Sequence, residues 1–576
     1  MKYLLFFLTL LICFSLKSQD STAIEKIFAE IERIDEQYNF NDDFPRKHPK
    51  KYGYQTPEQY IAQVAEYQKQ ITLLQALSKT DLSRQEQISK DIMVLRLNDN
   101  VSDVKFKTYL MPFNSEGGFY NQPIFFLSRL PFNKREDYEA YLNWLPTYAA
   151  YIRHKQQLLK QGVKENVMRP KVIVNNNIGL LALWVRDEVE DHPFFEPFAK
   201  MPESISVSDQ KKLKNKANNV IGQSILPAYQ DLMTFLRETY LPASSQKEGI
   251  SNISNGRAYY EDRIRYYTTM DMKPDSVYAI GLREVERIKG QMQKIIADLN
   301  FEGDFAAFIK FLRTDPQFYV KTPQELLNRA AWLSKKAEGQ LPPLFSKLYS
   351  LPFTVEPVPD AIAPNYTGGR AVSGNRKANR AGIYWVNTYN LPSRKLYTLP
   401  ALTLHEAVPG HHLQMTLSSE LEGLPDFRNT YYISAFGEGW GLYSEYLGEE
   451  MGMYSTPYEL FGRYTYEMWR ACRLVVDVGL HYKGWSRQQA VDYLAGNSAL
   501  SLHEVNTEID RYIGTPGQAV SYKIGELTIK RLREEANNAL EEQFDIQKFH
   551  ESVLKNGSVP LPVLEEEIHL YIKSSQ

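Results

Sequence analysis

Residues 397–412 of this 576-residue chain, Tyr-Thr-Leu-Pro-Ala-Leu-Thr-Leu-His-Glu-Ala-Val-Pro-Gly-His-His, lead an apolar run into a histidine-rich end. The last eight of these residues hold three of the protein's ten histidines together with a glutamate. Neutral imidazoles and a carboxylate are ligands of a catalytic zinc, and a neighbouring carboxylate can take a proton from the attacking water. The segment therefore predicts a metal-hydrolase site on a helix.

The spacing of these histidines differs from the usual zinc-peptidase motif. In H-E-x-x-H the two histidines lie four residues apart and face the metal from one side of a helix. Here the fourth position after His405 is Pro409, which cannot bind a metal. Because proline removes a backbone donor and Gly410 tolerates unusual angles, we expect a bulge or break in the helix. Such a break would make His411 the second ligand, with His412 as the alternative ligand or as a group that supports one.

A second acidic segment, residues 436–445, supplies the expected third ligand. Glu438 lies 27 residues beyond His411 and is flanked by two glycines, which let another backbone approach closely. Glu445, two turns further along the same face, is the alternative ligand. We expect it instead to accept a hydrogen bond from a ligand imidazole or to be an ordinary solvated carboxylate. The set of His405, His411 and Glu438 suits one zinc ion per chain, with cobalt or manganese as alternative metals.

A series of motifs extends this pattern over the second half of the chain. They are residues 255–260, 265–269, 382–387, 405–414, 438–440, 508–512, 516–519 and 522–525. These motifs resemble, in the same order, those of the large bacterial DUF885 family, which is placed with the zinc metallopeptidases of the H-E-x-x-H superfamily. The resemblance covers about residues 250–530. The chain departs from the family over residues 368–380, where the family commonly carries a Ser-Leu-Asp-Gly-Ser-like stretch, and this difference concerns the substrate pocket more than the chemistry.

The catalytic roles follow from the chemistry and from the resemblance. Glu406, one residue after a ligand, is the expected general base, which takes the water's proton and later gives it to the leaving amine. Both the resemblance and the chemistry point to Tyr522 as the donor to the oxyanion, because a phenol donates without a competing charge. Lys523 is the alternative donor. A chain with 38 tyrosines also offers a plain packing role for Tyr522.

Three residues are candidates for binding substrate. Arg511 could hold a substrate carboxylate through two parallel hydrogen bonds, or it could form a structural ion pair with neighbouring Asp510. Gln518 and Asn387 are the other candidates. Residues 383–387 alternate like a strand, and a strand edge beside a metal could pair with an extended peptide.

Helix signals dominate the remaining sequence. Three Thr-Pro-x-Glu/Gln segments, which begin at Thr56, Thr322 and Thr456, combine a capping hydroxyl, a proline at the first helical position and a Glu or Gln three residues after the cap. Strand signals are confined to three short segments, residues 171–174, 353–358 and 383–387. We predict a mainly α-helical, two-lobed, metallopeptidase-like fold with a small β-sheet beside the metal cleft.

The polar stretch at residues 244–249 is the expected boundary between two regions. Residues 19–250 would form a helical region that flanks the cleft, and residues 251–576 the catalytic metallohydrolase region. The formal net charge is −2 and no basic stripe is present, so no nucleic-acid partner is expected.

The first 18 residues are predicted to be a secretion signal peptide. Lys2 provides a positive start, residues 4–16 are mostly apolar, and Ser18 offers a small residue at the cleavage site. The apolar segment is short for a membrane anchor. Cleavage would leave one cysteine, Cys472, which excludes an internal disulfide. A periplasmic or secreted protein without stable membrane insertion is expected.

The sequence as a whole predicts an exported zinc-dependent peptidase that hydrolyses short peptides. One alternative is a metal-dependent amidase acting on a non-peptide amide. The other is a non-catalytic envelope protein that binds peptide or glycan through its many tyrosines. Glu406 separates the hydrolases from the binding protein, since binding alone has no use for a carboxylate beside a metal ligand.

Overall fold

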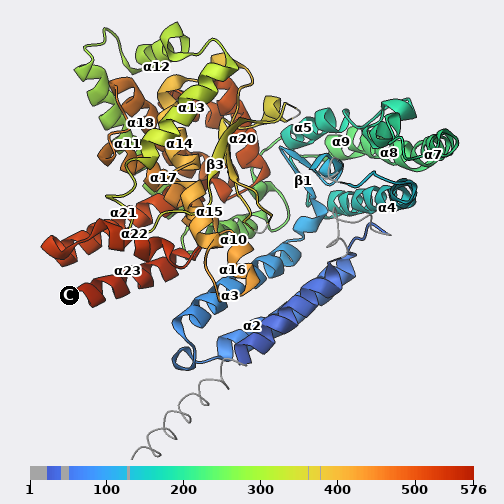
Figure 1. Ribbon diagram of the computed structural model, residues 1–576, viewed down its shortest axis with the longest axis horizontal. Helices are drawn as coiled ribbons and strands as arrows, with labels where there is room; N and C mark the ends of the chain where they lie inside the picture. The colour runs from blue at the N-terminus through green and yellow to red at the C-terminus, as the bar shows by residue number, and fades with distance from the viewer. Residues whose placement is uncertain (1–22, 40–50, 126, 128–129, 361, 377) are drawn as a thin grey trace, which may run out of the picture. The chain divides into compact units, whose positions relative to one another are not determined.

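The computed structural model describes residues 23–39, 51–125, 127, 130–360, 362–376 and 378–576 (Figure 1). The predicted signal peptide, residues 1–18, lies outside these ranges. The chain divides into two compact units: unit 1 comprises Met1–Glu248 and Asn252–Gly256, and unit 2 comprises Gly249–Ser251 and Arg257–Gln576.

In the part of unit 1 that the structure describes, the regular elements are helices and one small hairpin. Residues 23–38 form its first helix. The later helices are α2 (Pro57–Ala76), α3 (Arg84–Lys105), α4 (Arg135–Glu165), α5 (Lys171–Leu181), α6 (Glu196–Ala199), α7 (Val207–Val220), α8 (Leu226–Phe235) and α9 (Leu241–Ala243). The hairpin pairs β1 (Phe113–Asn114) with β2 (Gly117–Gly118).

The strand predicted at residues 171–174 is wrong, because this segment is the first turn of α5. Ile173 and Val174 are buried, and the buried positions continue at helical spacing with Asn177 and Leu181. A short apolar run cannot be assigned to strand or helix by periodicity alone, and here the residues beyond the run decide.

Unit 2 contains the remaining helices and a three-stranded sheet. The helices are α10 (Gly256–Thr268), α11 (Pro274–Asp298), α12 (Phe305–Thr314), α13 (Pro323–Glu338), α14 (Leu399–Glu406), α15 (His411–Ser419), α16 (Asp426–Thr430), α17 (Ser434–Glu450), α18 (Pro457–His481), α19 (Arg487–Asn497), α20 (Leu502–Gly514), α21 (Ser521–Leu540), α22 (Ile546–Leu554) and α23 (Leu561–Ser575). Within the described residues, no helix combines the length and apolar character that a bilayer span requires.

The helices begin where the capping signals predict. The hydroxyls of Thr56, Thr322 and Thr456 each accept a backbone hydrogen bond from the third residue after the cap, and a proline opens each helix. Such caps satisfy amide groups that lack a partner at the first turn. The mainly α-helical fold is therefore confirmed, and the local reason for several of its helix starts is visible in the sequence.

Close packing in unit 2 brings α17 against α21. A Cβ atom built on Gly439 would lie 2.6 Å from the Cα of Gly525, so the two backbones approach through paired glycines. α18 is buried along nearly its whole length. These helices hold the acidic segment of α17 rigidly inside the unit.

The sheet of unit 2 has the strand order β3-β5-β4, formed by β3 (Phe353–Pro357), β5 (Gly382–Val386) and β4 (Gly369–Val372). β3 runs parallel to β5, and β4 runs antiparallel to it. The strands predicted near residues 353–358 and 383–387 are confirmed. However, β5 is the central strand, so the edge that we expected at residues 383–387 is wrong. The edge strand that packs against α14 is β4.

Candidate metal centre

The helix that carries the first histidine breaks where the sequence predicts. α14 ends at Glu406 and α15 begins at His411. Between them, Ala407 leaves helical geometry with φ −91° and ψ −108°. A Cβ atom on Gly410 would lie 1.9 Å from the carbonyl oxygen of His405, so only glycine fits at this position. The break replaces the single continuous helix of the usual motif.

Two imidazoles converge on one carboxylate oxygen. The Nε2 atoms of His405 and His411 each lie 3.4 Å from Oε2 of Glu438. One donor atom from each residue lies within 4.8 Å of the other two. Tetrahedral zinc with bonds of about 2.0–2.1 Å separates its donors by roughly 3.3–3.4 Å. The donor types and the two spacings to Glu438 therefore fit a zinc ion.

His405 is oriented from its other side by Glu445. Its Nδ1 donates a hydrogen bond of 2.8 Å to Oε1 of Glu445, which leaves the Nε2 lone pair directed toward Glu438. The Nη2 atom of Arg470 lies 3.5 Å from the same carboxylate oxygen. A carboxylate that holds a ligand imidazole in this way fixes its tautomer and its direction. Glu445 thus lies where an orienting residue is expected, and not among the three converging donors.

The glycine at position 441 makes room for this arrangement. A Cβ atom there would lie 2.6 Å from the imidazole of His405. Position 441 lies one helical turn before Glu445 and three residues after Glu438, so α17 places its two carboxylates on either side of the ring. The glycines of this segment serve close approach, as their spacing suggests.

The pKa values of His405 and Glu438 are both shifted in the direction that favours their charged forms. Burial disfavours the imidazolium of His405, but hydrogen bonds to Glu438 and Glu445 outweigh burial and raise its pKa to about 9. Burial raises the pKa of Glu438, but the charges and hydrogen bonds of His411 and His405 hold it well below its usual range. A proton or a divalent cation can supply the positive charge that these carboxylates favour.

Glu406 is held by the edge strand. Its Oε2 accepts a hydrogen bond of 2.8 Å from the backbone N–H of Ala371 in β4. The charge of Glu406 also contributes to the raised pKa of His405. The structure therefore places the predicted general base between the centre and the strand.

Two tyrosines approach Glu438. The hydroxyl of Tyr432 donates to its Oε1 at 3.0 Å, and no pattern in the sequence singled out this tyrosine. The predicted donor Tyr522 lies at the start of α21, and burial and the Glu438 charge raise the pKa of its phenol. Both groups therefore stay protonated and able to donate. The alternative donor, Lys523, is fully buried and bonds to Glu467 at 2.7 Å, away from the centre.

The predicted substrate-binding pair is occupied by internal contacts. Arg511 bonds to Glu508 at 2.9 Å and to the amide oxygen of Gln518 at 2.7 Å. The neighbouring Asp510 pairs with Arg487 at 2.6 Å. Arg511 therefore forms a structural ion pair, but with the residue one turn earlier.

Two further predicted positions are structural. Asn387 is fully buried, and its amide donates to three backbone carbonyls, so it does not reach the centre. His412 donates from Nε2 to the carbonyl of Leu351 at 2.9 Å and packs against the sheet. Since His412 is turned away from Glu438, His411 supplies the second nitrogen. These environments depend on tertiary partners that the sequence does not display.

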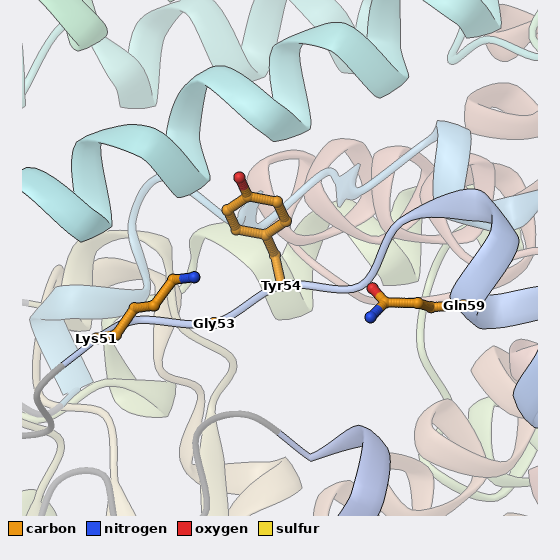
Figure 2. Close-up of a pocket in the computed structure, with 4 residues that line it drawn as sticks. All are labelled: Lys51, Gly53, Tyr54 and Gln59. Atoms are coloured by element: carbon orange, nitrogen blue, oxygen red, sulfur yellow. The ribbon is translucent and has the colours of Figure 1, made fainter.

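A separate cavity of about 280 Å³ lies in unit 1 (Figure 2). It is lined by Lys51, Gly53, Tyr54 and Gln59. The Gln59 side chain already accepts the backbone N–H of Thr56 as part of a helix cap. None of these four described residues carries a carboxylate or an imidazole, so they offer none of the donor types of the metal centre.

Comparisons with known proteins match the chain to one bacterial protein family and to two solved structures. The family model described as "Bacterial protein of unknown function (DUF885)" matches residues 45–568. The crystal structure of a "putative lipoprotein from Colwellia psychrerythraea" is similar with 27% identity and a TM-score of 0.82, over 97% of this chain and 98% of that one. A structure described as a "putative lipoprotein of unknown function from Shewanella oneidensis" is similar with 17% identity and a TM-score of 0.67, over 96% and 99%. No curated protein matches.

Proposed function

This chain belongs to the DUF885 family of bacterial proteins, and on that premise we propose that it is an exported zinc-dependent peptidase that hydrolyses short peptides. The observation that carries the proposal is the convergence of His405 and His411 on one oxygen of Glu438, with Glu406 beside the first ligand. Two imidazoles and a carboxylate form the ligand set of many zinc peptidases.

Each residue around the centre can take a separate role in amide hydrolysis. Zinc held by the three donors would supply Lewis-acid chemistry, polarising a carbonyl and acidifying water. Glu406 takes the proton of the attacking water and delivers it to the leaving amine nitrogen. Glu445 keeps His405 in the tautomer that presents Nε2. Tyr522 or Tyr432 donates to the oxygen that becomes negative.

The edge strand supports a peptide as the substrate. Gly368 faces β5, because its carbonyl accepts the N–H of Asn387 at 2.9 Å. Backbone groups alternate along an antiparallel strand, so those of residues 369 and 371 point away from β5. The N–H of Ala371 already holds Glu406. An extended peptide that paired with this edge would pass its carbonyls beside the general base.

Export is supported by the signal-like residues 1–18 and by the lipoprotein descriptions of the two structural relatives. Both observations concern the localisation of the protein and not its activity. The peptidase proposal therefore rests on the centre, and the export proposal on the N-terminus and the relatives.

The test begins with the zinc content of purified protein, measured by elemental analysis beside a His405→Ala variant. The expected result is about one zinc per chain that is lost in the variant, followed by peptide-library hydrolysis that stops with a chelator. A matched control is Glu422→Gln, an exposed glutamate outside the centre. Wild-type protein that neither contains nor takes up zinc would overturn the proposal.

A further inference from the structure

Arg370 is an exposed cation beside the centre. It lies in the edge strand β4, and its guanidinium donates to the hydroxyl of Tyr366 at 3.4 Å. Among the described residues, no carboxylate lies within ion-pair distance of it. Arg470 and Arg473 differ, because each is buried and paired, Arg470 with Glu445 and Arg473 with Glu508. Arg370 therefore keeps its charge available to solvent and solutes.

The strand fixes Arg370 next to the general base. The following residue, Ala371, donates its N–H to Glu406 at 2.8 Å, and consecutive Cα atoms are about 3.8 Å apart. Partial burial lowers the pKa of Arg370, but Tyr366, Glu406 and Glu438 outweigh it and raise the pKa. Exposed charges separated by more than about 10 Å are largely screened. The backbone of Arg370 therefore lies beside Glu406, and the charges of Glu406 and Glu438 favour the charged guanidinium.

The charge around the centre would repel an anionic substrate without such a cation. Glu438 faces the Nε2 atoms of both histidines, and Glu406 directly follows the first of them, so two carboxylates lie beside the point where a scissile bond would be placed. A guanidinium binds a carboxylate through two parallel hydrogen bonds, which gives direction as well as attraction. Arg511, the arginine expected from the sequence to do this, is already committed to Glu508 and Gln518.

We propose that Arg370 binds a carboxylate of the substrate near the scissile bond, so that the enzyme prefers short anionic peptides. This inference rests on the proposed peptidase function. The carboxylate has two sources, the free C-terminus of the peptide or an acidic side chain next to the cleaved bond. Both present the same group to the guanidinium, and peptides that carry one or the other distinguish them.

The experiment uses acetylated tetrapeptides selected from the library and prepared in three forms: as the free acid, as the C-terminal amide, and as the amide with one glutamate. Wild type, Arg370→Gln and Arg370→Lys are compared by kcat/KM. A charge-assisted hydrogen bond pair corresponds to about 10- to 100-fold, so Arg370→Gln should lower kcat/KM by that factor for carboxylate-bearing forms. The plain amide should change by less than about twofold. Arg376→Gln, an exposed arginine after β4, is the matched control.

A second readout separates this inference from the peptidase proposal. Binding of the same peptides to zinc-loaded Glu406→Gln protein is measured by calorimetry, with and without Arg370→Gln. If the carboxylate forms bind more strongly and Arg370→Gln abolishes the difference, the carboxylate site is supported. If wild-type protein nevertheless cleaves none of the peptides, only the peptidase proposal fails. Equal loss of activity on all three forms would assign Arg370 to the centre itself and overturn the inference. Equal or absent binding of the three forms would also overturn it.

Discussion

Unit 2 holds two buried clusters of carboxylates, and they differ in charge balance. In the first, Lys523 contacts Glu284, Glu467 and Glu526, and Arg287 and Arg463 also pair with Glu467. With Lys530, which lies 3.6 Å from Glu526, four cations there face the three glutamates. At the metal centre Glu406, Glu438 and Glu445 gather, and one arginine among the described residues, Arg470, lies within ion-pair distance of any of them.

The comparison indicates where a ligand belongs. A fully compensated cluster fixes helices and needs nothing further, because each buried charge has a partner. In a cluster with more carboxylates than cations, a bound divalent cation can neutralise the excess negative charge. In the Lys523 cluster the glutamates outweigh burial and raise the pKa of the ammonium. At the centre the same tendency falls on His405, because Glu438, Glu445 and Glu406 outweigh burial and raise the pKa of its imidazole.

The largest expected effect is on catalysis. Glu406→Gln removes the proton acceptor but keeps the shape of the side chain. Peptide hydrolysis should fall about 10³-fold, because a positioned general base contributes roughly 10²–10⁴. Zinc content and the thermal unfolding midpoint should match wild type. Activity, zinc analysis and a melting curve on one preparation check this, and unchanged turnover would remove Glu406 from the mechanism.

The balanced cluster should respond in stability and not in chemistry. Lys523→Met leaves buried glutamates without their shared cation, so the free energy of unfolding should fall by about 3–5 kcal/mol. Urea unfolding measures this loss. Zinc bound per folded chain should stay the same. The control is Lys530→Met, which removes a more distant contact to Glu526 at 3.6 Å, with an expected change below about 1 kcal/mol.

If Lys523→Met instead abolishes zinc binding in folded protein, the two clusters are not separate. Their division into a structural and a functional site would then be wrong.

Tyr522 and Tyr432 can be separated by what each removal changes. Tyr522→Phe should lower kcat about 10²-fold with little change in zinc affinity, the loss typical of one oxyanion donor. The measurement is kcat and KM for one peptide, with zinc affinity measured in parallel. A Tyr522→Phe enzyme with normal kcat would transfer the donor role to Tyr432, whose hydroxyl already contacts Glu438.

Much of the fold could be predicted because its signals are local. The helix starts at Thr56, Thr322 and Thr456 depend on residues within one turn, and the structure has them. The break after Glu406 follows from Pro409 and Gly410 in the same way. Residues 171–174 show the limit, since an apolar run of four residues fits a strand or a helix equally well.

The side-chain partners of the site could not be predicted, because they come from distant segments. The choice between His411 and His412 depends on the dihedral angles of the break and on Leu351, which lies 61 residues away and binds His412. Arg511 differs, because its partner Glu508 lies only three residues earlier in the same helix, α20, so this pair is visible in the sequence. Arg470 lies beside the centre only because its helix, α18, packs against α17, whereas Tyr432 lies just before α17 and six residues before Glu438.

Glu445→Gln tests how the centre is oriented. The amide can still accept the hydrogen bond from His405, but it brings no charge. Loss of such a supporting carboxylate typically weakens zinc binding 10- to 100-fold. Competition with a chromogenic chelator measures this affinity. Glu449→Gln, on the exposed side of the same helix, is the control and should leave zinc affinity unchanged. Equal affinities for wild type and Glu445→Gln would show that the charge of Glu445 is not needed.

The smallest expected effect is that of Tyr432→Phe. The hydroxyl bonds to Oε1 of Glu438, the oxygen opposite the one that faces both histidines, so its loss should loosen the carboxylate without removing a donor. One hydrogen bond to a charged group, about 1.5 kcal/mol, corresponds to roughly a tenfold loss of zinc affinity. The loss of zinc affinity in Tyr432→Phe should exceed the loss in Tyr389→Phe, the control, because Tyr389 is an exposed tyrosine outside the centre and holds none of its carboxylates. Chelator competition on both variants decides, and equal affinities would show that Glu438 is held by α17 alone.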